Sequence, residues 1–195
     1  MFYYTADLHL SMPDIIEKAN RPFESVDEMN HSIIQNFNEV LDKDDILMIL
    51  GDVSSYGNNP AKLLKEIHGK KVLITGNHDA EPLKHHSFRD CFVDIRDHEI
   101  IRDGDYKIYL SHYPMAEWDG FYRGIYHFYG HVHGSDQGAG YVMSLYPNAV
   151  NVGVDVNDFR PKTADMFIKE REISFSTMNI PKEFLEKVVH AKNLR

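Results

Sequence analysis

The first half of the chain alternates short apolar runs with amphipathic segments. The runs at residues 1–6, 45–50 and 71–75 (MFYYTA, DILMIL and KVLIT) have the length and composition of strands buried in a sheet. Between them, apolar residues recur at helical spacing over residues 26–41, and a second helix is predicted over residues 61–68. This β-α-β-α-β order predicts a layered α/β sheet.

Capping residues mark where these two helices begin and end. Ser25 is the expected N-cap of the first, and Glu28 three residues later completes a capping box. Asn59 and Pro60 open the second helix, and Gly69 ends it.

The second half of the chain is richer in strand-like segments. Residues 98–111 predict a hairpin that turns at Asp103 and Gly104. Residues 125–130, 141–146 and 149–154 are expected to form further strands. The last fifteen residues, 181–195, predict an amphipathic helix with Phe184, Leu185, Val188 and Val189 on one side. With no repeat or linker in view, we expect a single domain over residues 1–195.

Composition and charge narrow the function classes. The 195 residues carry a formal net charge of −9, which disfavours strong nonspecific binding of nucleic acid. The single cysteine, Cys91, cannot form an internal disulfide, which suits the reducing cytoplasm. The first residues lack the pattern of a signal peptide, and no window approaches 18 apolar residues, so we expect a cytoplasmic protein without membrane segments.

Five short polar motifs follow predicted strands, each just past the strand's carboxyl end. In open α/β sheets, ligands bind at that edge. The motifs are, in chain order, Asp7-Leu8-His9, Gly51-Asp52, Gly76-Asn77-His78-Asp79, Ser111-His112 and Gly130-His131-Val132-His133.

The residue types in these motifs suit a pair of metal ions. Aspartate carboxylates and neutral imidazoles are good ligands for divalent manganese, iron or zinc. In the D-x-H and H-x-H triplets at 7–9 and 131–133, an extended chain would send the first and third side chains to the same side. Gly51, Gly76 and Gly130 would let the backbone turn sharply beside an ion. Together the motifs predict a binuclear metal site.

Each motif has an ordinary interpretation when it stands alone. A Gly-Asp pair or an Asp-x-His triplet often marks a surface turn, and two histidines in a half-buried strand can simply pack. Their joint, ordered occurrence at strand ends favours the metal site. The other histidines are interpreted as surface or packing residues, namely His31, His68, His85, His86, His98, His127 and His190.

Three further polar residues are weaker candidates. Arg21 could bind a substrate phosphate, because a guanidinium group matches two phosphate oxygens, or it could lie exposed in a loop. Asn151 and Asp155 could support the metal ligands, or could belong to a plain strand end.

The ordered motifs D-x-H, G-D, G-N-H-D, H and G-H-x-H resemble those of the calcineurin-like metallophosphoesterase superfamily, over residues 7–133. The opening TADLHL, the Arg21-Pro22-Phe23 segment and the later NVGVD are similar to the small bacterial and phage phosphoesterases of that superfamily that lack a cap. The resemblance implies a four-layer αββα sandwich, in which helices flank two mixed β-sheets.

The resemblance also implies roles for individual residues. It implies that Asp79 hydrogen-bonds and orients His78, and that His78 is the general acid beside the leaving group. It implies two divalent metal ions and these ligands: Asp7, His9 and His133 for one ion, Asn77, His112 and His131 for the other, and Asp52 bridging both.

The reaction implied by the resemblance is hydrolysis of a phosphate ester by a metal-bridging hydroxide, with a histidine general acid. An open site and a net charge of −9 favour a small phosphorylated substrate, and we expect a phosphodiester or a nucleotide rather than a monoester. Residues 51–57 (GDVSSYG) lack the Asp-Arg pair of the superfamily's serine/threonine phosphatases. The alternatives are a phosphomonoesterase, a nuclease, or an interaction scaffold on the same fold.

Overall fold

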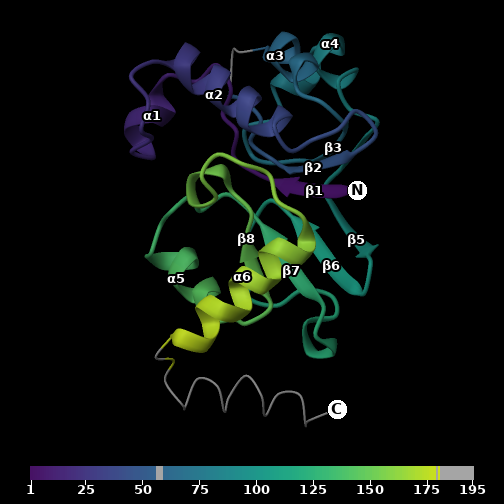
Figure 1. Ribbon diagram of the computed structural model, residues 1–195, viewed down its shortest axis with the longest axis vertical. Coiled ribbons are helices and arrows are strands. Elements are labelled where there is room, and N and C mark those ends of the chain that lie inside the picture. The colour runs from purple at the N-terminus through teal and green to yellow at the C-terminus, as the bar shows by residue number, and fades with distance from the viewer. Residues whose placement is uncertain (56–58, 179, 181–195) are drawn as a thin grey trace.

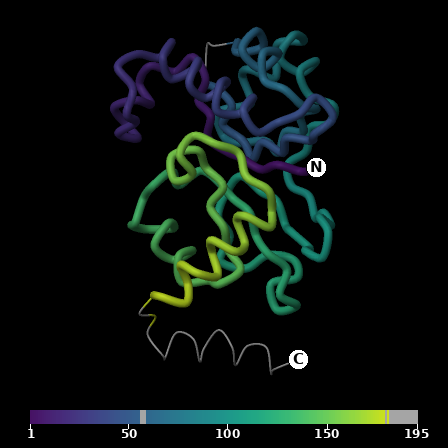
Figure 2. The backbone as a smooth tube through the Cα atoms, in the orientation of Figure 1, coloured from purple at the N-terminus to yellow at the C-terminus, as the bar shows by residue number. Residues whose placement is uncertain are grey.

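The computed structural model describes residues 1–55, 59–178 and 180, and within these residues the strands form two four-stranded sheets (Figure 1). The first sheet has the order β1-β2-β3-β4 and the second the order β5-β6-β7-β8. The first half of the chain builds the first sheet and the second half builds the second, as the colours in Figure 2 show. A mixed α/β fold is therefore confirmed.

The first sheet is built from the predicted apolar runs. Its strands are β1 (Phe2–Thr5), β2 (Ile46–Leu50), β3 (Lys70–Ile74) and a short β4 (Asp94–Arg96) that the sequence did not predict. All of these strands are paired in parallel, because each connection crosses back through helical segments. The expectation of two mixed sheets is therefore wrong for the first sheet.

Helices cover one face of the first sheet (Figure 1). They are α1 (Asp14–Lys18), α2 (Val26–Asn38), α3 (Ala61–Glu66) and α4 (His86–Arg89), with a 3₁₀ turn, η1 (Pro82–Lys84), before α4. The predicted N-cap of α2 is confirmed, since the Ser25 hydroxyl accepts a hydrogen bond from the Glu28 N–H. The Glu28 carboxylate, however, accepts from the Glu24 N–H and so does not close the expected box.

The second sheet is mixed. Strands β5 (His98–Asp103) and β6 (Tyr106–Ser111) form the predicted antiparallel hairpin, and β7 (Tyr126–Tyr129) and β8 (Ala149–Asn151) add in parallel. A single residue, Asp97, joins β4 of the first sheet to β5 of the second. The remaining elements are helices α5 (Gly138–Ser144) and α6 (Ala164–Thr177) and the 3₁₀ turns η2 (Phe121–Arg123) and η3 (Val154–Val156).

Two expectations for the second half need correction. The strand predicted at 141–146 is wrong, because these residues lie largely in α5, where Met143 is buried while Tyr141 and Val142 are exposed. Helix α6 was not predicted at all. The amphipathic helix expected at 181–195 lies outside the described residues.

The two sheets pack against each other through a shared apolar cluster. Met48 and Ile74 of the first sheet and Leu110 and Phe128 of the second belong to that one cluster, together with Phe167 of α6. Further apolar clusters lie on the helix-covered face of the first sheet and around α5 on the second. No helix in the described part of the chain is long and apolar enough to cross a membrane.

Candidate metal centre

The polar motifs of both sheets meet at the carboxyl ends of β1, β2, β3, β6 and β7. Six side chains form two groups of three whose potential ligand atoms lie within 4.8 Å of one another. One group is Asp7, His9 and His133, and the other is Asp52, His112 and His131. The structure therefore brings together residues that are up to 126 positions apart in the sequence (7 to 133).

Asn77 and Asp52 connect these groups. The Asn77 Oδ1 atom lies 3.0 Å from His112 Nε2 and 3.0 Å from His131 Nδ1, so Asn77 belongs to the second group. An oxygen of Asp52 lies 3.4 Å from His112 Nε2 and 3.7 Å from His9 Nε2. Asp52 thus lies between the two groups, where a bridging ligand would be expected.

The ring of His9 shows that the cluster is incomplete without a ligand. His9 is 1% exposed, and among the described residues neither of its ring nitrogens has a hydrogen-bond partner. Burial lowers the pKa of His9 to about 3, so the ring is neutral and can offer a lone pair. A buried polar group without a partner is costly in a folded protein, and a divalent cation would satisfy this one.

Charge within the cluster is also arranged for binding cations. Burial raises the pKa of Asp7 to about 6, although neighbouring histidines oppose this shift. The Asp7 carboxylate is fixed by the His131 N–H, which lies 2.9 and 3.0 Å from its two oxygens. For Asp52, burial acts to raise the pKa, but the hydrogen bond and charge of His112 outweigh it and the pKa is lowered.

The backbone at the candidate ligands is left-handed rather than extended. Asp7, His9, Asp52, His131 and His133 have φ values of 59°, 48°, 55°, 71° and 50°. Residues other than glycine rarely adopt this conformation, and it concentrates at functional sites. The expected extended D-x-H and H-x-H geometry is therefore wrong, although the first and third side chains of each triplet do meet.

Glycines allow the strand ends to approach each other, as expected. A Cβ atom on Gly76 would lie 2.4 Å from Asp52 Oδ1, and one on Gly130 would lie 2.7 Å from Asp7 Oδ2. Real Cβ atoms do not approach so closely, so a larger residue at either position would displace a candidate ligand.

The role expected for Asp79 needs correction. Its carboxylate is buried and accepts hydrogen bonds from the N–H groups of Asp52, Val53 and Gly76, at 2.8 to 3.0 Å. The described residues show no hydrogen bond between Asp79 and the His78 ring. Through these hydrogen bonds, Asp79 joins the end of β2 to the loop after β3. Asp79 therefore positions this loop and not the His78 ring.

His78 lies at the accessible side of the cluster. Its side chain is 40% exposed and its Nε2 lies 4.0 Å from Asp52 Oδ2, while its backbone N–H donates to Asp52 Oδ1 at 2.9 Å. The ring is therefore next to the candidate ligands without belonging to either group of three.

The expectation that Arg21 binds a substrate phosphate is wrong. The Arg21 side chain is fully buried and pairs with both carboxylate oxygens of Asp155, at 2.8 and 3.0 Å. Its Nη1 donates to the carbonyl oxygen of Leu8, and its Nη2, which also pairs with Asp155, donates to that of Asp7. A phosphate cannot reach this guanidinium group, because the protein itself occupies it.

Asp155 extends this network to a candidate ligand. Its Oδ2 lies 2.7 Å from His133 Nδ1, which leaves Nε2 of that ring for a cation. Burial acts to lower the pKa of His133, but the hydrogen bond that the ring donates to the Asp155 carboxylate and the nearby charge of Asp7 outweigh it, so the pKa is raised. Asn151 also supports His133, by donating to its carbonyl oxygen at 2.7 Å. The supporting roles considered for Asp155 and Asn151 thus match their contacts.

Tyr113 is a further neighbour of the cluster. It is 49% exposed, and its ring centroid lies 4.6 Å from that of His131 and 5.1 Å from that of His112. Its position directly after His112 was the only signal in the sequence. Cys91 and His127 lie elsewhere, in contacts that agree with packing roles.

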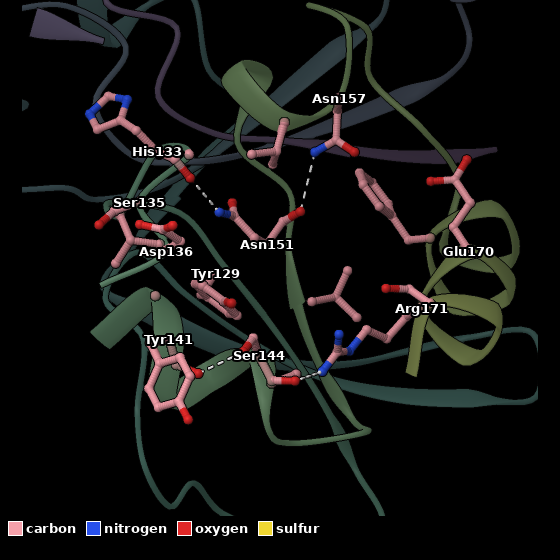
Figure 3. A pocket seen from close by; sticks show the side chains of 18 residues that line it. Tyr129, His133, Ser135, Asp136, Tyr141, Ser144, Asn151, Asn157, Glu170 and Arg171 are labelled. Atoms are coloured by element: carbon pink, nitrogen blue, oxygen red, sulfur yellow. Dashed lines mark hydrogen bonds between the residues drawn. The ribbon is translucent and has the colours of Figure 1, made fainter. Parts of the chain in front are cut away.

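Two hollows border the cluster. One, of about 630 Å³, is lined by His9, His78 and His133 and by residues of α1. The other, of about 420 Å³, lies between α5, α6 and β8 and reaches His133 at one end (Figure 3). In this second hollow Arg171 is held by the carbonyl oxygens of Ser144 and Tyr146.

Comparisons with known proteins include two uncharacterised proteins that align with most of this chain. No protein-family model matches the sequence. The chain is 32% identical over 171 residues to the uncharacterized protein MJ1445 of Methanocaldococcus jannaschii. The aligned region covers 86% of this chain and 89% of MJ1445. The crystal structure of AQ665 from Aquifex aeolicus, a protein of unknown function, superposes with a TM-score of 0.70 at 26% identity, covering 87% of this chain and 98% of AQ665.

A more remote structural similarity is to YfcE, a phosphoesterase from E. coli, with a TM-score of 0.40 at 16% identity over 78% of this chain and 77% of YfcE. That similarity is too distant to assign an activity. The identity of 32% over most of both chains does establish a relationship: the chain belongs to the same protein family as MJ1445 of Methanocaldococcus jannaschii.

Proposed function

We propose that this protein is a phosphoesterase that depends on two divalent metal ions and hydrolyses small phosphodiesters or nucleotides. The observation that carries the proposal is the His9 ring, whose two buried nitrogens find no partner in the described part of the chain although they lie inside a cluster of oxygen and nitrogen donors. The three apolar clusters, two outside the sheets and one between them, support the four-layer sandwich of the metallophosphoesterases.

The donors fit two ions. Asp7, His9 and His133 would hold one ion, and Asn77, His112 and His131 would hold the other, with Asp52 shared between them. When bound, the two ions would supply positive charge to the phosphate oxygens and lower the pKa of water, which is the chemistry that such pairs contribute to ester hydrolysis.

The chain's own residues would transfer a proton and hold the metal ligands in position. His78 is partly exposed beside Asp52, so its ring can reach the leaving oxygen and protonate it as general acid. Asp79 holds the backbone on both sides of the cluster in place, so that Asp52 and the Asn77–His78 loop keep a fixed separation. The Arg21–Asp155 pair fixes the tautomer and the orientation of His133.

The test combines metal analysis with turnover. The purified protein is stripped with a chelator, reloaded with manganese, and assayed on bis(p-nitrophenyl) phosphate. We expect two ions per chain and activity that disappears on chelation and returns with manganese. Asp52→Ala should remove both ions and the activity, whereas Asp136→Ala, at an exposed carboxylate outside the cluster, should change neither.

Two results would contradict the proposal. One is full turnover after the chelator has removed all metal. The other is retention of both ions by Asp52→Ala, which would show that this carboxylate is not shared between them.

A further inference from the structure

The hollow beside α1 differs from the rest of this acidic protein in its lining. Its volume is about 630 Å³, within the range of small-molecule sites. Among the described residues that line it there is no carboxylate, and Lys18 is the one fully charged side chain.

One wall of this hollow is apolar and well supported. Ile15 is 4% exposed and belongs to the main core, and Met12 and Ala19 pack against the same core. Val132, between two candidate ligands, contributes an apolar side chain from the loop after β7. A flat, apolar group could therefore rest against the Met12, Ile15 and Ala19 wall without displacing buried polar groups.

The hollow also opens directly onto the metal cluster. His9 and His133 belong to one of the two groups of three, and His78 is the proposed proton donor. A group bonded to a phosphate at the cluster and protonated by His78 would therefore leave into this hollow. Lys18 is exposed at its rim, and its pairing with Asp14 at 3.4 Å is a surface contact that a ligand can replace at little cost.

The geometry points to this hollow as the leaving-group subsite, and to a nucleoside that carries a second phosphate as its occupant. This inference rests on the proposed function and names its substrate class. The base lies against the Met12, Ile15 and Ala19 wall, the ester oxygen lies beside His78, and the second phosphate pairs with Lys18. The Asn20 amide, which also lines the hollow, is available to the edge of a base.

Binding measurements on the manganese-loaded protein test this inference by calorimetry. The probes are inorganic phosphate, adenosine 5′-monophosphate and adenosine 3′,5′-bisphosphate. We expect the monophosphate to bind about tenfold more tightly than phosphate, as burial of roughly 60 Å² of apolar surface would supply. The bisphosphate should gain up to about fivefold more, which is the upper end for an exposed ion pair.

Two variants locate the effect. Lys18→Ala should abolish the advantage of the bisphosphate over the monophosphate, whereas Lys169→Ala should not, although Lys169 is also paired with an aspartate four residues away on a helix. Ala19→Trp fills the hollow and should remove the advantage of both nucleotides, and Ala139→Trp, at an exposed position on α5, should not. Unchanged phosphate binding shows that each variant keeps a folded metal centre.

The outcomes separate this inference from the proposed function. If wild-type protein hydrolyses bis(p-nitrophenyl) phosphate but binds the nucleotides no better than phosphate, the subsite is refuted and the hydrolase stands. The subsite is also refuted if Lys18→Ala and Ala19→Trp leave nucleotide affinity unchanged. If nucleotide binding shows the expected dependence but no ester is hydrolysed, the hollow stands as a nucleotide-binding site, whereas its role for a leaving group fails together with the proposed function.

Discussion

At the scale of single residues, most of the candidate ligands adopt a backbone conformation that is unfavourable for their residue types. Five of them have left-handed φ angles, and each such residue costs on the order of 1 kcal/mol or more. The surrounding hydrogen bonds compensate, as at Asp7, whose carbonyl oxygen accepts from Arg21 and whose carboxylate accepts from the His131 N–H. A strained but fixed geometry of this kind is suited to holding an ion without rearrangement.

His78→Ala tests the division between metal ligands and proton donor. We expect the metal content to remain at two ions per chain, because the His78 ring belongs to neither group of three. Turnover should fall by about 10²–10⁴ for esters with poor leaving groups and much less for p-nitrophenyl esters, which need no proton. Metal analysis and steady-state kinetics measure both effects, and loss of metal from this variant would contradict the assignment.

Asp155→Asn tests the support of His133. The substitution keeps the shape of the side chain but leaves the buried Arg21 without a charged partner. We expect the metal-free protein to lose about 3 kcal/mol of unfolding free energy, and metal affinity to fall about 10–100-fold because the His133 ring loses its orienting carboxylate.

Urea unfolding and metal titration measure these effects, with Asp136→Asn as a control at an exposed aspartate. Wild-type metal affinity in Asp155→Asn would show that His133 needs no such support.

At the scale of elements, the sequence predicted the strands and the helix start whose signals lie within a few neighbouring residues. The apolar runs became β1, β2 and β3, and Ser25 caps α2, because buried strands and helix ends each leave a local signature. Part of helix α5 was mistaken for a strand because residues 141–146, which include its second half, are mostly apolar, although Met143 is the buried residue of this helix. The five residues of α1 carry too short a pattern to be recognised, so the wall of the leaving-group hollow was missed.

The roles of the polar residues were only partly predictable. All seven candidate ligands converge, since each follows a strand whose end lies at a common edge. Burial, however, cannot be read from a motif. Arg21 and Asp79 were expected to contact a substrate and a catalytic ring, yet both are buried and hold backbone groups in place.

Strand β7 contains a buried histidine that should make stability depend on pH. His127 is fully buried, with Nδ1 bonded to the Tyr109 carbonyl oxygen and Nε2 accepting from the Met115 N–H. Burial lowers its pKa to about 4, against about 6.5 when unfolded, so folding favours the neutral ring. Its contribution is therefore present above pH 6.5 and is lost as the pH falls toward 4.

The size of this effect is up to about 3 kcal/mol. Urea unfolding of wild type and of His127→Gln at pH 7 and pH 4.5 measures it, and the variant should lose less stability over this interval. His31→Gln, at an exposed histidine on α2, should behave as wild type. Equal acid sensitivity in His127→Gln and wild type would rule out this residue as the cause.

At the scale of the whole molecule, the metal ions should stabilise the fold. Ions that bind only the folded state at about 100 times their dissociation constants add about 2.7 kcal/mol each. For a chain of this size the pair should raise the melting temperature by roughly 10 °C or more. Thermal unfolding with manganese and with a chelator measures the shift, which should be absent in Asp52→Ala; no shift in wild type would contradict binding at this cluster.

The chain passes from the first sheet to the second at the single residue Asp97, and this joint separates the candidate ligands into two sets. Each proposed ion would take ligands from both sides of that joint, Asp7 and His9 with His133 for one, and Asp52 and Asn77 with His112 and His131 for the other. Under this assignment, neither half of the chain by itself would hold the full set of ligands. Catalysis would report directly on the docking of the two halves, so a protein split at this joint would regain activity only when its fragments reassociate.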